Sequence, residues 1–416
     1  MKKLKPTILF ISENFLPETN AAAARVFERG IYWKEWGYKV KYITSFPNRH
    51  MGKSHKGYSD KLFQSEIING LDILRVKTYI PKKKDTFYRA LHQISFMFSS
   101  LIASLFTKKT DAIIVTTPQF FCSISGLIVA KIKRTLFILE VADIWTNSIK
   151  ATQQTSGYFY HFLKRMETLI YKRSDAIIVL TQGFKEEIVK RGIEEDKIFV
   201  VMNGAKREVF NKKVTNSDLK DKFNTRNKIV IGYAGSLGPS QGLMNIVETA
   251  AILEKEKKLN VLFLLLGEGD QKEPLIKASE GLNNIVVVGG KERNLMPKYL
   301  SLFNIGLAHL NESSAFKTTI PSKIFEMMSA GLPILLVSPK GEASELIQKL
   351  KIGYWVPSGN PELLTQTIAQ MLSDPQGIIR FSRNSLDASK EFTREKQALK
   401  FLDAVDTVIE RKKNAI

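Results

Sequence analysis

A lysine and a glutamate stand one helical turn apart at the start of a short segment that runs into an apolar strand. The segment is TTIPSKIFEMMSAGLPILLV, residues 318–337, and the pair is Lys323 and Glu326. Pro321 suits the first turn of a helix and Gly331 suits its C-terminal end. A cation at a helix N-terminus opposes the helix dipole, so Lys323 predicts a bound anion. The alternative is an exposed ion pair between Lys323 and Glu326.

Glycine turns follow three apolar runs in the same half of the chain. The turns are GYAGSLGPSQGL, LLLGEGDQKEPL and VVVGGKERNLMPKYL, and they contain Gly235, Gly238, Gly242, Gly267, Gly290 and Lys291. Glycines allow the main chain to approach a ligand closely, and amides at a helix start bind phosphate. A single glycine turn is a weak signal, but several at one edge of a sheet favour a nucleotide site.

The elements that must position these residues form two series. Short apolar runs such as TILFIS, DAIIVTT and TLFILEV alternate with helix-length segments in the first half, and KIVIGYAG, VLFLLLGEG and PILLV do so in the second. Runs buried on both faces and separated by helices predict parallel sheets. We therefore expect an α/β protein with two Rossmann-like lobes, residues 1–203 and 204–394. A last helix over residues 395–416 is expected to return to the first lobe.

The composition is that of a globular protein with excess positive charge. The chain has 416 residues, 44% hydrophobic and 25% charged, with a net charge of +21. Such a charge predicts a polyanionic partner: nucleic acid, anionic lipid or a phosphorylated substrate. A nucleic-acid-binding protein would place aromatic and basic residues together on an exposed sheet or a recognition helix. Here the basic clusters flank apolar helices, so we expect no nucleic acid partner.

Cysteine and histidine usage argues against two kinds of site. Cys122 is the only cysteine and lies in an apolar run, so neither a disulfide framework nor a cysteine metal site can form. The five histidines lack metal-ligand spacing, and no Asp-x-Asp follows a buried strand. We expect no metal and no other cofactor. The cysteine usage favours a cytoplasmic protein. The N-terminal apolar run is about as long as a buried strand and lacks a cleavage pattern, so we expect it to be the first strand.

The segment FYRALHQISFMFSSLIASLFTKK, residues 87–109, differs from its surroundings. It is apolar nearly all round, with lysines at 82–84 before it and Lys108 and Lys109 at its end. Its length approaches that of a membrane span, but His92 and several serines interrupt it. The pattern is compatible with a helix that faces the core and with a helix that lies on an anionic membrane surface.

The motifs of the second lobe resemble the nucleotide-sugar-binding domain of family 4 glycosyltransferases, retaining enzymes with the GT-B fold. GYAGSLGPSQG, LLLGEG, IVVVGG, IPSKIFEMMSAGLPIL and GEASELI occur in the family's order. The first lobe is similar to the acceptor lobe of a branch that assembles bacterial surface polysaccharides, in ISENFLPETNAAAARVFERGIYWKEWGYKVKYITSFPN, EVADIWTNSI and VVMNGAKREVF. That branch includes transferases of N-acetyl-L-fucosamine in O-antigen synthesis. The resemblance covers essentially the whole chain and implies two lobes whose parallel sheets face a central cleft.

The resemblance assigns donor-side roles in the second lobe. Glu326 matches the second glutamate of the family's E-x7-E motif, a clamp for ribose hydroxyls, whereas Thr318 stands at the first position. Ser236 and Gln241 stand where the family has a phosphate-binding arginine and lysine. Lys323 and the loop amides are then the expected diphosphate ligands. The donor-side set is Gly235, Ser236, Gly238, Gln241, Gly267, Gly290, Lys291, Ser322, Lys323 and Glu326.

The resemblance also points to acceptor-side residues in the first lobe. In ETNAAAAR small alanines replace the family's common glycine pair, which places Asn20 and Arg25 near the acceptor. Ala142 stands where the family often has a histidine, so Asp143 is the polar group that remains. The alternatives are a helix cap for Asp143 and a solvent-exposed first-turn residue for Arg25. The acceptor set is Asn20, Arg25 and Asp143, and the catalytic set is Lys323, Glu326 and Asp143.

The implied activity is transfer of a sugar, such as N-acetylfucosamine, from a UDP-linked donor to a polyprenyl-diphosphate-linked glycan. The product would be an O-antigen or capsule precursor, made with retention by a peripheral protein at the inner face of the membrane. One alternative is a GT-B epimerase or hydrolase, which needs a histidine–glutamate dyad, and no histidine is identified on the motif strands. The other, from a different class, is a basic nucleic-acid-binding protein.

Overall fold

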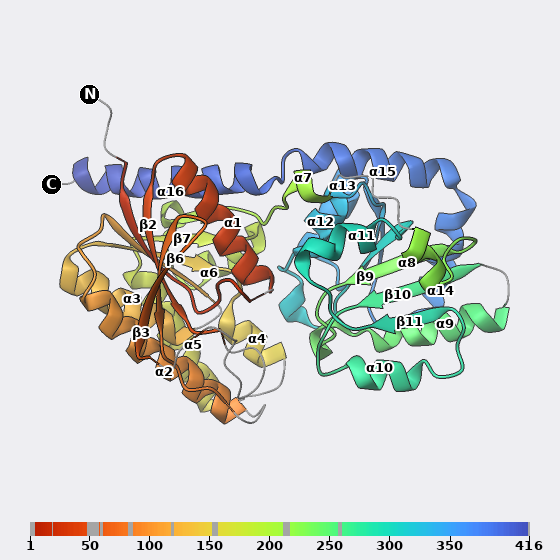
Figure 1. Ribbon diagram of the computed structural model, residues 1–416, viewed down its shortest axis with the longest axis horizontal. Coiled ribbons are helices and arrows are strands. Elements are labelled where there is room, and N and C mark those ends of the chain that lie inside the picture. The colour runs from red at the N-terminus through yellow and green to blue at the C-terminus, as the bar shows by residue number, and fades with distance from the viewer. Residues whose placement is uncertain are drawn as a thin grey trace. The chain divides into compact units, whose positions relative to one another are not determined.

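The computed structural model describes residues 5–18, 20–47, 58, 61–81, 86–117, 120–151, 157–210, 217–256 and 260–414. The chain forms two compact units (Figure 1). The first comprises Met1–Met202 and Arg394–Ile416, and the second comprises Asn203–Thr393. Each boundary falls one residue before the predicted one.

The first unit contains an eight-stranded sheet in the order β3-β4-β2-β1-β5-β6-β7-β8, parallel except for the edge strand β3. Its strands are β1 (Thr7–Ile11), β2 (Lys39–Ser45), β3 (Phe63–Ile68), β4 (Leu71–Val76), β5 (Ala112–Thr116), β6 (Leu136–Val141), β7 (Ala176–Val179) and β8 (Ile198–Val200). Every residue of β5 and β6 is buried, as expected for parallel strands that are covered on both faces.

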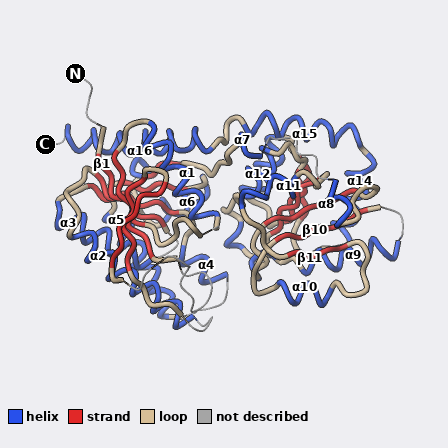
Figure 2. The backbone as a smooth tube through the Cα atoms, in the orientation of Figure 1, coloured by secondary structure: helices blue, strands red, loops and turns tan. Residues whose placement is uncertain are grey.

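Helices cover both faces of this sheet (Figure 2). They are α1 (Ala21–Glu35), α2 (Thr86–Leu105), α3 (Phe120–Lys133), α4 (Trp145–Ala151), α5 (Tyr158–Arg173), α6 (Gln182–Lys190) and α16 (Arg394–Asn414). Alternation along β1 shows the two layers, because Leu9 and Ile11 pack with α2, α3 and α5 whereas Ile8 and Phe10 pack with α1 and α16. The return of the C-terminal helix is confirmed, and Trp33 Nε1 of α1 donates a hydrogen bond to the Ala398 carbonyl of α16 at 3.0 Å.

The second unit contains a six-stranded sheet, all parallel, in the order β11-β10-β9-β12-β13-β14. Its strands are β9 (Ile229–Ala234), β10 (Val261–Leu266), β11 (Ile285–Val288), β12 (Ile305–His309), β13 (Ile334–Val337) and β14 (Gly353–Val356). Its helices are α7 (Arg207–Phe210), α8 (Ser217–Lys222), α9 (Met244–Glu256), α10 (Lys272–Ala278), α11 (Met296–Leu300), α12 (Lys323–Ser329), α13 (Glu342–Leu350), α14 (Pro361–Ser373) and α15 (Pro375–Ser389).

The strand order of the second sheet reverses between β9 and β12. From β9 the chain proceeds to β10 and β11 on one side, and the later strands lie on the other side. Ligands of open parallel sheets bind at such a reversal, beyond the carboxyl ends of the strands. The loops after β9 and β12 are therefore the first place to look for a site.

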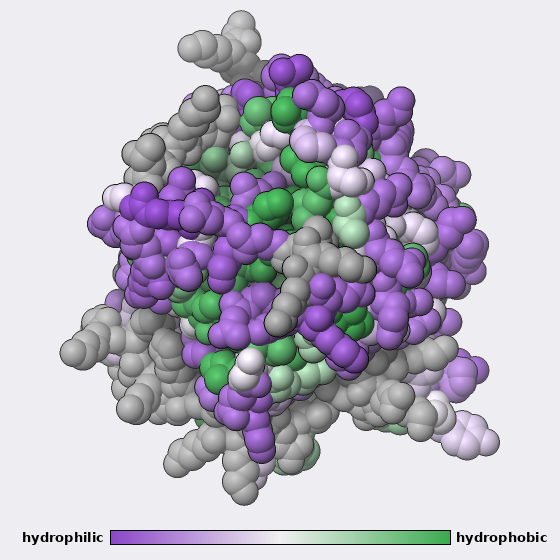
Figure 3. Space-filling model, turned by 90° about the vertical axis from the view of Figure 1, so that its right-hand side faces the viewer, coloured by the Kyte–Doolittle hydropathy of each residue, from purple (hydrophilic) through white to green (hydrophobic). Residues whose placement is uncertain are grey.

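Two features bear on the surroundings of the protein. None of the helices in the described part of the chain is long and apolar enough to cross a membrane. The surface in the view of Figure 3 is mostly hydrophilic, in keeping with a chain in which one residue in four is charged.

Cys122 of α3 lies in the core of the first unit, with its side chain fully buried. Its Sγ donates a weak hydrogen bond to the Thr116 carbonyl at 3.7 Å. Burial raises the pKa of this thiol well above its ordinary value, since a thiolate would be unsolvated there. Cys122 is therefore a packing residue.

Candidate active site

Two glycines at the reversal of the second sheet lie at close approaches, and the one at Gly267 faces main chain that leaves no room for a side chain. Gly235 follows β9, and a Cβ at this position would lie 2.8 Å from Lys323 Nζ. Gly267 follows β10, and a Cβ there would lie 1.8 Å from the Gly235 carbonyl oxygen. These turns, predicted from their glycines, bring the loop after β9 against the first residue of α12.

Lys323 has no carboxylate partner in the part of the chain that the structure describes. Its Nζ lies 3.6 Å from the centroid of the Tyr233 ring and 3.5 Å from Gln241 Oε1, and it forms no ion pair with any described residue. Burial lowers the pKa of Lys323 to about 7, although the nearby charge of Glu326 offsets part of this effect. A cation over an aromatic face with a depressed pKa is poised for an incoming anion.

Glu326 pairs with a different residue. Its Oε1 lies 3.1 Å from Nη1 of Arg293, which follows the glycine turn after β11. Both side chains are partly exposed. The alternative of a Lys323–Glu326 ion pair was therefore wrong. Arg293 was not predicted as a site residue, because only the tertiary fold brings the turn after β11 to α12.

The loop between β9 and α9 presents unpaired main-chain amides. The Leu237 amide donates to the Glu268 carbonyl at 2.9 Å, whereas the amides of Ser236 and Gly238 have no hydrogen-bond acceptor among the described residues. The Tyr233 hydroxyl donates to the Ser236 carbonyl at 2.6 Å and so fixes this peptide. Amides of this kind, beside a lysine, can bind a phosphate group.

His309 is a buried polar residue that the sequence analysis missed. It is the last residue of β12, so the expectation of no histidine on these strands was wrong. Its Nδ1 lies 2.6 Å from the Gln241 carbonyl and its Nε2 lies 3.2 Å from Asn245 Oδ1. Burial lowers the pKa of His309 to about 4, and the charge of Lys323 lowers it further, while the bond to Gln241 opposes the shift. The ring is therefore neutral at pH 7.

The His–Glu dyad of a GT-B epimerase or hydrolase is not formed by these residues. Nδ1 of His309 contacts the loop after β9 and Nε2 contacts Asn245 of α9, whereas Glu326 contacts Arg293. Within the described ranges we find no hydrogen bond between His309 and Glu326. His309 is placed to hold the loop, and the charge of Lys323 is near enough to lower its pKa.

Three other predicted donor-side residues are Gly290, Lys291 and Ser322. The Gly290 amide donates to Glu268 Oε1 at 2.9 Å, and this bond, with the charges of Lys272 and Lys291, lowers the pKa of Glu268. Lys291 and Ser322 are partly exposed, and Ser322 is the residue before α12 without a side-chain capping bond.

Asn20 of the first unit caps α1. Its Oδ1 accepts a hydrogen bond from the Ala23 amide at 2.7 Å, and its Nδ2 donates to Asn14 Oδ1 at 2.8 Å. Both ends of the side-chain amide are thus engaged in local structure. Contact of Asn20 with an acceptor stays a prediction.

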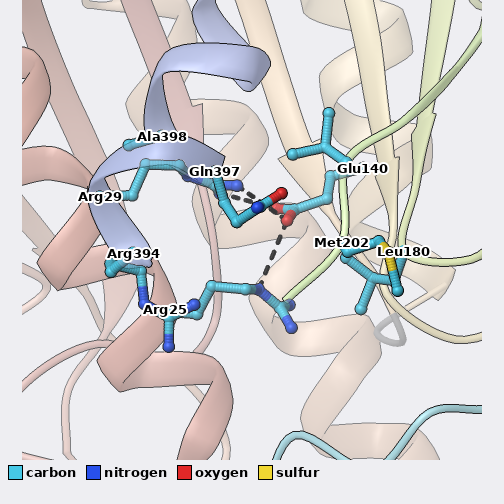
Figure 4. A pocket seen from close by; sticks show the side chains of 9 residues that line it. Arg25, Arg29, Glu140, Leu180, Met202, Arg394, Gln397 and Ala398 are labelled. Atoms are coloured by element: carbon cyan, nitrogen blue, oxygen red, sulfur yellow. Dashed lines mark hydrogen bonds and ion pairs between the residues drawn. The ribbon is translucent and has the colours of Figure 1, made fainter. Parts of the chain in front are cut away.

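Arg25 is buried in an ionic cluster (Figure 4). It lies on α1, where its Nε is 3.4 Å from Glu140 Oε1 of β6, and Arg29 forms a bidentate pair with the same carboxylate at 2.9 and 2.8 Å. Arg394 of α16 donates to Glu28 Oε2 at 2.9 Å. The alternative of a solvent-exposed Arg25 was wrong, because its guanidinium is needed beside Glu140, which the helical spacing does not show.

Burial in this cluster disfavours the charged form of Glu140, yet its carboxylate stays ionised. Desolvation would raise the pKa of Glu140, but Arg29 and Arg25 outweigh it and lower this pKa to about 2. Burial also lowers the pKa of Arg25. The cluster therefore depends on all its members and ties α1 and α16 to the sheet.

Asp143 follows β6 and precedes α4. Ser148 Oγ donates a short hydrogen bond to Asp143 Oδ2, and Thr117 Oγ1 donates to the Asp143 carbonyl at 3.2 Å. Burial raises the pKa of Asp143 to about 6, against the bond from Ser148, and the charge of Glu167 adds to the rise. Asp143 thus combines a bond within the start of α4 with a carboxyl that titrates near neutrality.

No group of three or more His, Cys, Asp or Glu side chains is placed to hold a metal ion in the part of the chain that the structure describes. The chemistry of the second unit is instead that of a lysine, a glycine loop and an arginine–glutamate pair. These groups suit a ligand that carries phosphate and hydroxyl groups.

The same region of the second unit matches a known family. Residues 215–388 match the family model described as glycosyl transferases group 1. This stretch of the second unit is thus similar to group 1 glycosyl transferases. The chain is 24% identical over 338 residues to WcaI of Escherichia coli K12, whose name describes a colanic acid biosynthesis glycosyl transferase, with 78% of this chain and 81% of that protein covered. It is 24% identical over 287 residues to TuaH of Bacillus subtilis 168, named for teichuronic acid biosynthesis, with 66% and 68% covered.

Solved structures identify the fold of the whole chain. HepE of Anabaena, crystallised with UDP-glucose, superimposes with a TM-score of 0.72 at 15% identity, over 97% of this chain and all of HepE. The two-lobe GT-B fold expected from the sequence is thereby confirmed. At this identity the likeness concerns the fold alone.

Proposed function

We propose that this glycosyltransferase moves a sugar from a UDP-linked donor to a polyprenyl-diphosphate-linked glycan during synthesis of a surface polysaccharide, with retention of configuration. The observation that carries the proposal is Lys323, a cation that lies beside the amides of Ser236 and Gly238. None of the three has a partner of opposite character, carboxylate or acceptor, among the described residues. The choice of donor is supported by the UDP-glucose bound by HepE. The choice of pathway is supported by the names of WcaI and TuaH, which mention colanic acid and teichuronic acid. The donor sugar, such as N-acetylfucosamine, belongs to the same proposal.

The proposed chemistry relies on electrostatic stabilisation of the leaving diphosphate. Negative charge develops on the departing phosphate oxygens, and Lys323 with the loop amides would meet it there. Glu326 would accept hydrogen bonds from the ribose hydroxyls. The departing phosphate itself can take the proton of the acceptor hydroxyl, and Asn20, Arg25 and Asp143 are the proposed acceptor-side residues of the first unit.

A screen of nucleotide sugars against thermal unfolding tests the proposal. A UDP-sugar present at about a hundred times its Kd should stabilise the folded chain by about 2.7 kcal/mol, because it binds only the native state. EDTA should leave the shift unchanged. If no nucleotide sugar raises the melting temperature, or if a nucleic acid does so instead, the proposed activity is wrong.

The next prediction concerns Glu326. Glu326→Gln should fold but lose roughly tenfold to a hundredfold in kcat/KM, because a neutral amide binds ribose hydroxyls more weakly than a carboxylate. Binding of UDP should be compared with binding of 2′-deoxy-UDP and 3′-deoxy-UDP. The variant should lose the preference for the intact ribose.

Arg293→Gln is the matched control, since it breaks the same ion pair while leaving the carboxylate in place. It should keep the ribose preference. Equal losses of that preference in both variants would show that Glu326 acts only through its pair with Arg293.

A lipid-linked acceptor requires the protein to reach a membrane, and we propose that the outer side of α2, α3 and α5 does so. The helices pack side by side in that order. We call this the three-helix face. Its exposed apolar side chains are Phe98, Ile102 and Leu105 of α2, Ile128 and Ile132 of α3, and Phe159, Phe162 and Leu169 of α5.

The charges of the three-helix face favour an anionic surface. Its exposed basic side chains are Arg89, Lys131, Arg165, Lys172 and Arg173. The only acidic residue in the three helices is Glu167, which is buried and paired with Arg191 at 2.6 Å. Apolar side chains among cations are typical of proteins that bind anionic lipid. Lys82, Lys83 and Lys84, predicted to contribute, lie outside the described residues.

Vesicle flotation tests the three-helix face. Replacing Lys131, Arg165 and Lys172 together with glutamine should weaken binding to anionic vesicles by roughly a hundredfold and reduce its salt dependence, since each cation contributes about 1 kcal/mol at such a surface. Transfer to a short water-soluble acceptor should survive. Glutamine replacements at Lys272, Lys349 and Lys390 of the second unit remove as many charges and serve as the control. Two results would contradict the proposal. One is an equal loss of vesicle binding in both triple variants, and the other is flotation of the unchanged protein with neutral vesicles as strong as with anionic ones.

A further inference from the structure

His309 links β12, the strand that precedes α12, to the glycine loop. We infer that His309 is a positioning residue for the donor diphosphate, acting through Gln241 on the loop that faces Lys323. The inference rests on the proposed function, because it concerns how that donor site is held. Its basis is the hydrogen-bond geometry around the ring.

The proton on the ring can be placed from its neighbours. The Gln241 carbonyl can only accept, so at 2.6 Å His309 Nδ1 must carry the hydrogen. In a neutral ring Nε2 is then an acceptor. It needs a donor from Asn245, whose amide can turn to present Nδ2 in place of Oδ1 at 3.2 Å. The side chain of His309 is 1% exposed, so no water competes for either nitrogen.

The carbonyl that accepts the hydrogen bond from His309 belongs to the tight turn in the middle of the glycine loop. Gln241 ends the turn Pro239–Gln241 and precedes Gly242, which has a positive φ of 61°. The adjacent Ser240 carbonyl accepts from the Asn311 amide at 2.9 Å, so the end of β12 holds two successive peptides of the turn. These bonds fix the direction in which the Gln241 side chain leaves the main chain.

The Gln241 side chain contacts both Tyr233 and Lys323, so the position of its main chain affects where the ammonium lies. Its Oε1 lies 3.2 Å from the Tyr233 hydroxyl and 3.5 Å from Lys323 Nζ. Tyr233 in turn holds the Ser236 carbonyl and supports the lysine with its ring. If the Gln241 peptide moves, the ammonium and the amides of the loop lose their common arrangement. Preorganisation of such groups is what makes them effective toward a phosphate.

Three substitutions separate the two ring nitrogens. In His309→Asn the amide Nδ2 stands as many bonds from the main chain as Nδ1 does, so it can donate to the Gln241 carbonyl. In His309→Gln the amide reaches the position of Nε2 and can bond only Asn245. His309→Leu keeps a similar volume and makes neither bond.

Calorimetric titration of the full-length variants with UDP and UMP tests the inference. The two ligands differ by the outer phosphate, so the ratio of their Kd values reports the diphosphate site and not the nucleoside site. We expect His309→Asn to keep the ratio of the unchanged protein. His309→Gln and His309→Leu should lose about tenfold in that ratio, in proportion to one hydrogen bond.

The melting temperature of each variant separates this role from a structural one. A merely structural histidine would lower UDP and UMP affinity together, in step with stability, and would leave the ratio unchanged. A normal ratio in His309→Gln, or an equal loss in His309→Asn and His309→Leu, would overturn the inference while the donor assignment stands. If the unchanged protein binds neither UDP nor any other nucleoside diphosphate, the proposed function fails and this inference fails with it.

Discussion

Lys323→Met is expected to lower kcat/KM by about two to three orders of magnitude, the loss seen when a single group that stabilises developing negative charge is removed. No carboxylate among the described residues is paired with the ammonium, so a donor phosphate can bind it without displacing a partner. Charge on the leaving diphosphate grows in the transition state, so kcat should fall as well as donor affinity. A rise in KM alone would limit Lys323 to ground-state binding.

The pKa of about 7 for Lys323 predicts a pH profile. The charged amine is the form that binds a diphosphate, so kcat/KM should be highest below pH 7 on this account and should fall about tenfold per unit above it. His309, with a pKa of about 4, stays neutral across this range and does not contribute.

Lys323→Arg provides the control for this profile. A guanidinium remains charged throughout, so the variant should keep part of the activity and lose the alkaline decline. The measurement is kcat/KM between pH 6 and 9 for both proteins. An identical decline in the arginine variant would assign the titration to another group.

Glu140→Ala should destabilise the first unit by about 3–5 kcal/mol, because it leaves two arginines buried without their carboxylate. Arg25 and Arg29 both approach this side chain, which is fully buried. Unfolding of the full-length chain in urea, followed by circular dichroism, measures the loss. Arg411→Ala, which removes the exposed pair with Asp196, should cost less than about 1 kcal/mol and serves as the comparison.

The same carboxylate makes this stability depend on pH. Its folded pKa is lowered to about 2 from an ordinary value of 4.5, so its contribution is complete above pH 4.5 and is lost as the pH falls toward 2. The difference in the free energy of unfolding between the unchanged protein and Glu140→Ala should therefore become smaller as the pH falls from 4.5 toward 2. A constant difference, or equal costs for Glu140→Ala and Arg411→Ala, would mean that the charge of Glu140 does not stabilise the cluster.

The sequence was most informative where local pattern determines structure. Unbroken apolar runs predicted the buried strands β5 and β6, and glycines after such runs predicted the close turns beside Lys323. Both signals lie within short windows of the sequence. Partners were harder to predict, because they come from distant segments. Glu326 meets Arg293 rather than Lys323, since α12 lies beside the turn after β11.

Buried polar residues were the least predictable part of the site. His309 ends a run of apolar residues and has no spacing that marks it, and its role emerges only once the loop after β9 folds over it. Arg25 has the spacing of an exposed first-turn residue, yet Glu140 of a strand far along the chain draws it inward. Such residues depend on tertiary neighbours that no local window contains.

The burial of Cys122 has a practical consequence. Alkylating reagents attack the thiolate, and a thiol that is fully buried with a raised pKa offers almost none. The native protein is therefore close to a cysteine-free background. A single cysteine introduced at Phe162 of α5, which is 56% exposed, would take a fluorescent or spin label selectively and leave the native thiol in place. Spectroscopy could then follow this surface position without replacing Cys122, so the packing that Cys122 provides in the core is kept.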